Sequence, residues 1–206
     1  MKHVTARRGF VRRCGAALAA LAVWPRQSSA SEIAPDEAWL QGLTGKHRQL
    51  FDVAVSKDGR SLGRLSNFLD AYGEAYGLKD ADLNAIFGMH GSAVPIALND
   101  AMWAKYELGI RYSEMDPRTG APAVGNPWGK GGPTSVARLQ ERGVRFIVCM
   151  RSVRRLSGEL AGAAGNAESV RVELMGNLLP GVTPVPAMIV AVNRAHEAGL
   201  SYAYIG

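Results

Sequence analysis

Cys149 is the residue best suited by type and position to do chemistry in this chain of 206 residues. It ends an apolar run that begins at Val144 and precedes an amphipathic stretch, so we predict that a buried strand ends here and a helix begins. A helix N-terminus favours the thiolate, which is the nucleophilic form of cysteine. Arg151 and Arg154 follow within two turns and would attract an anionic substrate. The opposing interpretation is structural, because free cysteine is among the most buried residue types and arginines on a helix usually form a solvated face.

His90 is the candidate partner of Cys149, since it ends a second apolar run, Leu83–His90. Imidazole can act as a general base or a metal ligand near neutral pH. A flavodoxin-like strand order 2-1-3-4-5 would place the two strand ends about 9 to 10 Å apart, which is two strand spacings. A direct cysteine–histidine hydrogen bond would then need a loop movement. The sequence therefore favours a pocket-lining or hydrogen-bonded structural role for His90.

Cofactor motifs are missing from the sequence. The glycines around Lys130 lack the spacing of a phosphate loop, and Gly88 and Gly91 do not form a dinucleotide fingerprint. No pair of histidines or cysteines has the spacing of zinc ligands. We therefore expect neither a metal nor another cofactor.

Strand-like apolar runs alternate with segments of helical periodicity, which is typical of a parallel sheet with crossover helices. The predicted strands are His47–Val55, Leu83–His90, Val144–Met150, Thr183–Val185 and Leu200–Ile205. The segment Asn166–Asn177 fits either a strand or a helix, and we expect a helix. The sequence thus predicts a three-layer α/β/α, flavodoxin-like domain with a five-stranded, mostly parallel sheet. Ligands of such sheets bind beyond the carboxyl ends of the strands.

Residues 106–133, called the excursion below, show no periodicity and contain many glycines and prolines. Connections beyond about 12 to 15 residues are uncommon in compact domains and are usually functional or disordered. We expect the excursion to be a cover or an interface. The aromatic residues around it either line a binding surface or pin it onto the sheet, and we expect pinning. They are Trp103, Tyr106, Tyr112 and Trp128.

The first 30 residues have the layout of an export signal. Arg7 and Arg8 resemble the paired arginines of a twin-arginine signal, which the twin-arginine export machinery recognises. The alanine-rich run that follows is shorter than the about 20 residues needed to span a bilayer. We therefore expect cleavage near Ala30 and a periplasmic single domain of residues 31–206. The alternative is a basic N-terminal segment of a cytoplasmic protein.

The net positive charge of the chain comes from this N-terminal segment. The chain contains 24 Lys and Arg and 18 Asp and Glu, a formal net charge of +6. Residues 1–30 contain six basic residues and no acidic one, so 18 basic residues match 18 acidic ones in the rest. A balanced domain has no electrostatic reason to bind nucleic acid or an anionic membrane. We expect no nucleic-acid partner.

The stretch Val144–Gly158, VRFIVCMRSVRRLSG, resembles the cysteine strand of the DsrE/DsrF-like sulfur-relay family. Two other stretches are similar to that family: His90–Ala93 after the second strand, and the C-terminal pattern that ends in Ala198–Ile205. The resemblance runs from about Leu50 to the C-terminus. It implies a flavodoxin-like fold, a homo-oligomer, and a cysteine that carries sulfur as a persulfide. Cys149 is the residue that carries over.

The chain departs from the family pattern at Ser152, in the length of the excursion and in its export signal. The resemblance nevertheless implies a sulfurtransferase or sulfur carrier that accepts or relays sulfane sulfur on Cys149, and the export signal would place it in the periplasm. Its partner would be a small sulfur species or a sulfur-carrying protein. The alternative is a non-catalytic binding or oligomeric assembly module with the excursion as its contact surface. A third hypothesis is a flavin- or nucleotide-binding protein.

Overall fold

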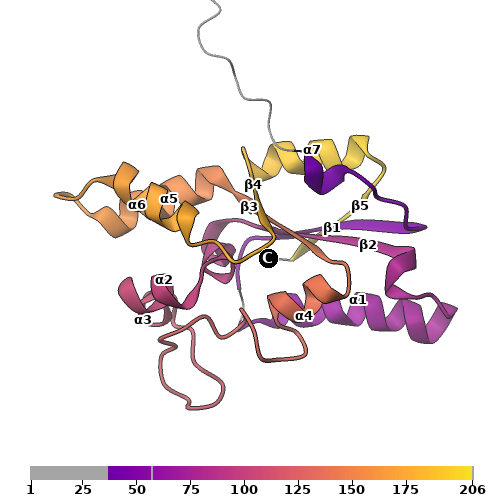
Figure 1. Cartoon of the computed structure of the whole chain (residues 1–206), viewed down its shortest axis with the longest axis horizontal. Helices are drawn as coiled ribbons and strands as arrows, with labels where there is room; N and C mark the ends of the chain where they lie inside the picture. Colours follow the sequence, from indigo (N-terminus) through magenta and orange to yellow (C-terminus); the bar gives the residue numbers. More distant parts are fainter. Residues whose placement is uncertain (1–36, 57, 206) are drawn as a thin grey trace, which may run out of the picture. The chain divides into compact units, whose positions relative to one another are not determined.

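The computed structural model describes residues 37–56 and 58–205, which are built around a five-stranded sheet (Figure 1). The strands are β1 (His47–Val53), β2 (Leu83–Met89), β3 (Arg145–Cys149), β4 (Val182–Val185) and β5 (Ser201–Ile205). All four strand pairings are parallel. The predicted three-layer, flavodoxin-like α/β architecture with five strands is therefore confirmed. The predicted signal at Arg7 and Arg8 and its cleavage near Ala30 lie outside the described residues.

The order of the strands is β4-β3-β2-β1-β5, so the predicted order 2-1-3-4-5 is wrong. The first three connections each step to the next strand, and the fourth returns to the far side of β1. Because crossovers between parallel strands are right-handed, the first three connections lie on one face and the last on the other. Both strand orders bury the same apolar residues, which is why periodicity did not distinguish them.

Helices cover both faces of the sheet. They are α1 (Arg60–Tyr76), α2 (Asp100–Lys105), α3 (Leu108–Tyr112), α4 (Val136–Glu141), α5 (Met150–Ala161), α6 (Ala167–Gly176) and α7 (Met188–Glu197), with three short 3-10 helices, η1 (Ala38–Leu40), η2 (Asp80–Asp82) and η3 (Gly91–Ala97). In Figure 1, α7 and η1 lie above the sheet, and α1 and α4 lie below it. Arg194 of α7 binds Glu37 at 2.7 Å, which ties the start of the described chain to this helix.

Successive residues of a strand pack alternately into two separate hydrophobic cores, one on each face of the sheet. Phe51 and Val53 of β1 belong to the larger core with Leu65 of α1, whereas Leu50 belongs to the smaller core with Met188 of α7. This alternation follows from the two-residue period of a strand. The face under α7 is therefore distinct from the face that carries α1 and the excursion.

Two segments show how local chemistry sets element boundaries. The ambiguous segment 166–177 forms α6, as predicted, and the Asn166 side chain caps it by accepting the amide of Glu168 at 3.0 Å. The segment after His90 forms two short elements, η3 and α2, and not one continuous helix. Pro95 lies inside η3, and α2 begins anew because Asn99 accepts the amide of Met102 at 3.2 Å.

The excursion is not structureless, since it contains α3 and an isolated bridge between Met115 and Pro122. Trp103 before it is fully buried and donates its indole N–H to the carbonyl of Pro95 at 2.9 Å. The ring of Trp103 meets that of Trp128 edge to face, with centroids 5.5 Å apart. These two tryptophans pin the excursion onto the domain, which was the expected role.

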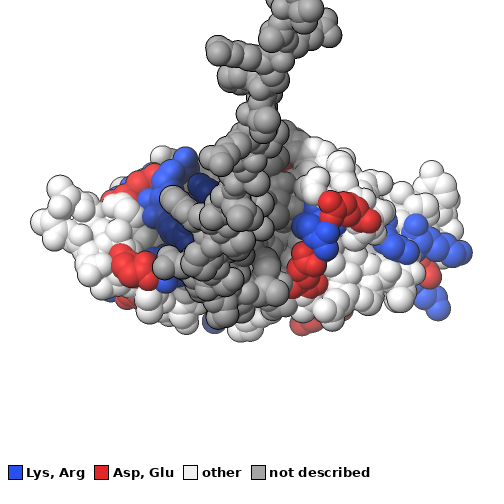
Figure 2. Space-filling view, turned by 90° about the horizontal axis from the view of Figure 1, so that it is seen from above, with Lys and Arg blue, Asp and Glu red and all other residues white. Residues whose placement is uncertain are grey.

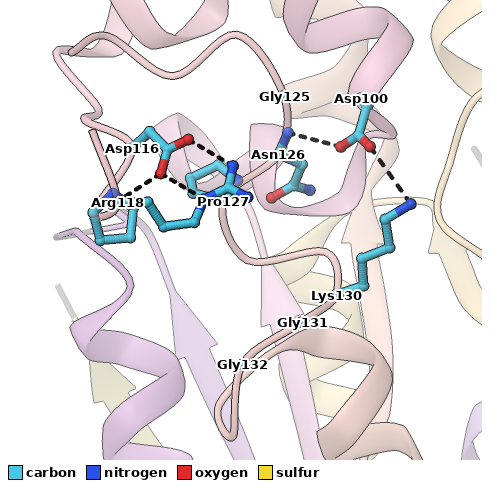
Figure 3. Close-up of a pocket in the computed structure, with 10 residues that line it drawn as sticks. Asp100, Asp116, Arg118, Gly125, Asn126, Pro127, Lys130, Gly131 and Gly132 are labelled. Atoms are coloured by element: carbon cyan, nitrogen blue, oxygen red, sulfur yellow. Dashed lines mark hydrogen bonds and ion pairs between the residues drawn. The ribbon is translucent and has the colours of Figure 1, made fainter. Parts of the chain in front are cut away.

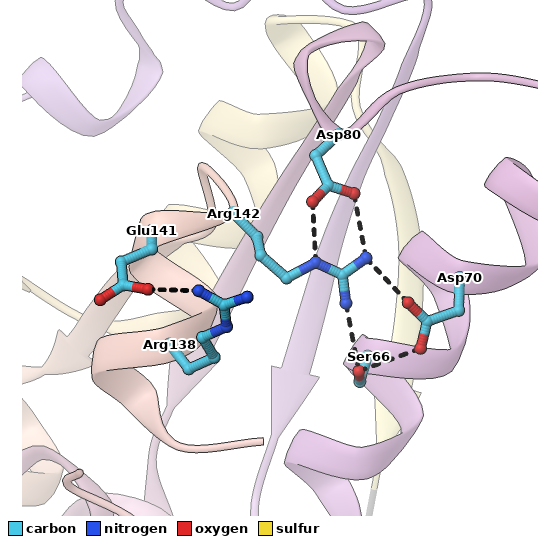
Figure 4. A network of polar contacts seen from close by, with 6 residues as sticks. All are labelled: Ser66, Asp70, Asp80, Arg138, Glu141 and Arg142. Atoms are coloured by element: carbon cyan, nitrogen blue, oxygen red, sulfur yellow. Dashed lines mark hydrogen bonds and ion pairs between the residues drawn. The ribbon is translucent and has the colours of Figure 1, made fainter. Parts of the chain in front are cut away.

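A polar network joins α1, η2 and the residue after α4 near the amino ends of the strands (Figure 4). The Arg142 guanidinium binds both carboxylate oxygens of Asp80 at 2.8 and 3.0 Å, Asp70 at 2.8 Å and the Ser66 hydroxyl at 3.2 Å. These bonds hold the pKa of Arg142 above its ordinary value, the bond to Asp80 contributing most. Elsewhere, on the face in Figure 2, basic side chains lie beside acidic ones.

No helix among the described residues is both long and apolar enough to cross a membrane.

Candidate functional site

Cys149 is the last residue of β3 and the N-cap of α5, as the sequence predicted. Its side chain is buried, with 4% of the residue exposed, in the smaller core under α7. Its sulfur accepts the backbone N–H of Met188, the first residue of α7, at 3.4 Å. Sγ therefore lies at the beginning of two helices, where unpaired amides favour negative charge.

His90 directly follows β2, which is adjacent to β3, so the expectation that a third strand separates the ends of these two strands is wrong. Met89 of β2 pairs in register with Val148 of β3, which makes His90 and Cys149 lateral neighbours. Neighbouring strands are about 4.8 Å apart. Both side chains belong to the α7 face, since Gly88 lies under Met188 on that face and His90 follows two residues later in extended backbone.

His90 also contacts a buried carboxylate. Its Nε2 lies 2.9 Å from Oδ1 of Asp52 on β1, and neither of these buried atoms has another hydrogen-bond partner among the described residues. A proton on Nε2 is therefore needed between them. The other oxygen of Asp52, Oδ2, accepts the hydroxyl of Tyr202 on β5 at 2.8 Å. Tyr202, Asp52 and His90 thus form a polar row across β5, β1 and β2, and the row ends beside Cys149 on β3.

The hydrogen bonds of the polar row fix the charge of its carboxyl group. Burial raises the pKa of Asp52, but the hydrogen bonds from His90 and Tyr202 outweigh it and hold the pKa below its usual value. Burial and the bond to Asp52 raise the pKa of Tyr202 to about 12. At neutral pH Asp52 is thus an anion and Tyr202 a donor.

Ser152, one of the departures from the family pattern, ties the strand ends together. Its hydroxyl accepts the amide of Gly91 at 3.1 Å, which links the first turn of α5 to the residue after His90. Gly91 has φ of +56°, and a Cβ there would lie 2.7 Å from the carbonyl oxygen of Ala54. Only glycine fits this close approach without strain.

Arg151 and Arg154 are exposed on the first two turns of α5. Arg154 acts on Glu168 of α6 and helps to lower the pKa of that carboxyl, after the larger effect of a hydrogen bond from Arg171. The two predicted arginines therefore add positive charge to the outside of α5. The structure records no hydrogen bond or ion pair from either of them to Cys149 or His90.

Sequence reasoning missed Asp52 and Tyr202. A signal for Asp52 was present, because it is a charged residue inside an otherwise apolar strand, LFDVAV. Charged residues are almost never buried without a partner. Tyr202 had no comparable signal, since tyrosine is common in strands.

Potential metal ligands do not converge in the described part of the chain. No group of three or more His, Cys, Asp or Glu side chains there could hold a metal ion. A cleft of about 610 Å³ lies at the excursion (Figure 3), and Cys149 is not among the residues that line it. Its lining includes Asp100, Asp116, Arg118 and Lys130.

Comparisons with known proteins assign no family. No family model matches the sequence, and no curated protein is similar to it. Among solved structures, the fold is similar to a protein of unknown function, MTH1491 from Methanobacterium thermoautotrophicum, with a TM-score of 0.42 and 15% identity. That similarity covers 77% of this chain and 99% of the other. The described fold and site define a class, a parallel three-layer α/β domain with a buried cysteine at a strand-to-helix junction.

Proposed function

We propose that this protein accepts sulfane sulfur on Cys149 and passes it on, as a DsrE/DsrF-like sulfur carrier or sulfurtransferase exported to the periplasm. The observation that carries the proposal is the N–H of Met188 donating to Sγ at the start of α7. A persulfide anion, like a thiolate, is stabilised by such donors and by the dipoles of the two helices. His90, which follows the adjacent strand β2, is the base that we assign to this thiol.

The reaction balances without an added oxidant. The Cys149 thiol gives its proton to His90, and the thiolate attacks the outer sulfur of a small persulfide donor. The sulfur–sulfur bond of the donor breaks, the donor leaves as a thiolate, and a new sulfur–sulfur bond forms on Cys149. Asp52 stabilises the imidazolium formed at His90. A thiolate of the acceptor then attacks the outer sulfur and releases Cys149.

Burial restricts the donor. Since Cys149 is only 4% exposed, a donor reaches Sγ when it is small or when the first turn of α7 moves aside. The arginines on α5 attract an anionic donor towards this end of the sheet. Small anionic sulfur species are therefore the proposed substrate class.

The test is the intact mass of the protein, purified without reductant, before and after incubation with inorganic polysulfide. We expect a gain of about one sulfur atom that dithiothreitol removes. Cys149→Ser is the matched control and gains nothing. A folded wild-type sample that gains no sulfur, while Cys149 reacts with a thiol reagent only after denaturation, contradicts the proposal.

The second candidate function is oligomeric assembly without catalysis, which exposed apolar side chains on α7 and β5 favour. Ile189 is 78% exposed and Tyr204 59% exposed, and β5 pairs only with β1 among the described strands. Exposed apolar residues beside an open sheet edge are typical of interfaces. Light scattering at micromolar concentration tests this candidate. We expect a homo-oligomer that Tyr204→Lys dissociates, and a monomeric wild type contradicts it.

A further inference from the structure

Glu114, in the excursion, carries a buried carboxyl group that the proposed sulfur chemistry does not use. The residue is 5% exposed. Its Oε1 accepts the hydroxyl of Ser56, which lies in the loop between β1 and α1. Its Oε2 is buried and has no hydrogen-bond partner among the described residues. A buried carboxylate oxygen without a donor is costly, so this arrangement calls for a cation or a proton.

A second carboxyl group, that of Asp58, faces Glu114 from the loop between β1 and α1, which also contains Ser56. Asp58 lies within hydrogen-bonding reach of Glu114, and the Arg60 guanidinium lies 3.2 Å from Asp58 Oδ2. Burial, followed by the charge of Asp58 and the hydrogen bond to it, raises the pKa of Glu114 to about 7. The charged groups that face Glu114 across this contact are Asp58 and, behind it, Arg60.

One proton on Glu114 gives the polar groups of Ser56, Asp58 and Glu114 compatible hydrogen-bond partners. With Glu114 protonated, Ser56 donates to Oε1, the carboxyl O–H of Glu114 is a donor for the carboxylate of Asp58, and Arg60 balances the charge of Asp58. Without that proton, two carboxylates repel each other and Oε2 stays unsatisfied. A divalent cation fits less well, because Ca²⁺ takes six to eight oxygen ligands and Arg60 already occupies Asp58.

The position of Glu114 connects this cluster to the cleft in the excursion. The backbone of Glu114 donates to the carbonyl of Gly109 at 2.8 Å and accepts the amide of Ala123 at 2.9 Å. Residues 114–123 thus form a closed loop, and its Asp116 and Arg118 make one wall of the cleft (Figure 3).

The other wall of the cleft is fixed independently of Glu114. The amide of Asn126 donates to Asp100 at 2.9 Å, and the Asn126 side chain donates to the carbonyls of Ile96 and Leu98 at 3.0 and 2.7 Å. Movement of residues 114–123 would therefore change the width of the cleft, because only one wall moves.

We propose that Ser56, Asp58 and Glu114 form a protonation-dependent latch that holds residues 114–123 against the loop after β1 and so sets the width of the cleft. The latch goes beyond the proposed sulfur chemistry, since Cys149 lies under α7 on the opposite face of the sheet. The closed latch holds a proton that an exposed glutamate, with an ordinary pKa of 4.5, has already lost at neutral pH. The closed state is therefore destabilised as the pH rises from about 4.5 to about 7, and this loss is complete above that range.

Hydrogen exchange of the full chain at pH 5.5 and pH 8.5, corrected for the intrinsic pH dependence of exchange, tests the latch. The amides of Asp116 and Ala123, which donate to carbonyls within residues 114–123, report on it. We expect their protection to fall about tenfold at the higher pH while protection in β1 and β2 is unchanged. Equal protection of the loop at both values would overturn the proposal.

Three variants separate the latch from other pH effects. Glu114→Gln keeps an acceptor for Ser56 and a donor for Asp58 but cannot ionise, so we expect the loop to stay protected at pH 8.5. Asp58→Asn gives ionised Glu114 a donor, and asparagine tolerates the φ of +53° at this position, so the same result is expected. The control Glu107→Gln, at an exposed site in the excursion, keeps the wild-type response.

Two results of this series reject the latch. A Glu114→Gln or Asp58→Asn variant that folds and still loses protection at pH 8.5 shows that another group titrates. Protection of the wild type that is restored at pH 8.5 by millimolar Ca²⁺ or Mg²⁺ assigns a metal site to the cluster instead. If Glu114→Gln fails to fold, Asp58→Asn alone decides between these outcomes.

Discussion

A single buried carboxylate, Asp52, organises the polar side chains nearest to Cys149. Its two oxygens bind His90 and Tyr202, and the bonds keep it ionised although burial opposes this. With the Nε2 proton of His90 held by Asp52, the imidazole is fixed in one tautomer and one orientation. Asp52 is thus a positioning residue for the proposed chemistry rather than a catalytic one.

We predict that Asp52→Asn slows sulfur loading of Cys149 by about tenfold or more at pH 7, because the imidazolium that forms at His90 loses its counter-charge. The measurement is the rate of persulfide formation as a function of pH, followed by mass. Tyr202→Phe is the control. It removes one donor to Asp52, and we expect a smaller effect, about threefold or less. Equal rates in Asp52→Asn and wild type would show that His90 takes no part.

Beyond the carboxyl ends of β1 and β2, the amides of His90 and Ser92 donate to the carbonyls of Val53 and Ala54 at 3.0 and 2.9 Å, and Gly91 between them comes close to the same backbone. Gly91 follows β2, lies against the carbonyl of Ala54 after β1, and donates its amide to Ser152 on α5. The strand ends that carry the polar row and Cys149 therefore depend on a glycine with positive φ. Gly91 differs in this respect from most glycines in the helices, where an added Cβ would meet little or nothing.

We predict that Gly91→Ala lowers the free energy of unfolding by about 2 kcal/mol or more, because alanine at positive φ would also collide with a backbone carbonyl. Gly63 in α1 is the matched control, since a Cβ there meets nothing within 4 Å. Gly63→Ala should stabilise by about 0.5 to 1 kcal/mol through helix propensity. Urea denaturation measures both. A destabilisation of less than about 0.5 kcal/mol at Gly91 would contradict the strain argument.

The sequence predicted the elements better than their arrangement. Five strands, the helix at 166–177 and the strand-to-helix position of Cys149 followed from periodicity and capping. The sequence did not predict that the strand ends at His90 and Cys149 are adjacent. Periodicity shows which residues of a strand are buried, but it does not show which strands lie beside it. For the same reason the contact between Asp52 and Tyr202, which joins strands far apart in the sequence, was not predicted.

Over the whole molecule, two faces of one sheet carry different features. The face under α7 carries Cys149 and the polar row, and the face under α1 carries the excursion with its cleft. At the amino ends of the strands, Arg142 ties three elements together through two carboxylates and a hydroxyl. Arg142 is the common partner of Asp70 and Asp80, and the network is half-buried. Removal of Arg142 would therefore leave two partly buried carboxylates without that partner.

We predict that Arg142→Ala lowers the free energy of unfolding by about 1 to 3 kcal/mol, since bidentate, partly buried ion pairs are stronger than exposed ones. The control is Arg138→Ala, which removes an exposed pair with Glu141 at 2.7 Å (Figure 4). Exposed pairs contribute about 0 to 1 kcal/mol. Thermal and urea unfolding measure the loss of stability in both variants, and we expect a larger loss for Arg142→Ala than for Arg138→Ala. Equal losses in the two variants would contradict this expectation.

The two edges of the sheet differ in how they can meet other chains. β4 has four residues and contains Pro184, which has no N–H to offer an incoming strand. Short edge strands with proline resist the pairing that leads to aggregation. β5 has no proline and presents tyrosines instead. A strand of another chain can therefore pair with β5 more readily than with β4. Any extension of the sheet by a second molecule would take place at the β5 edge.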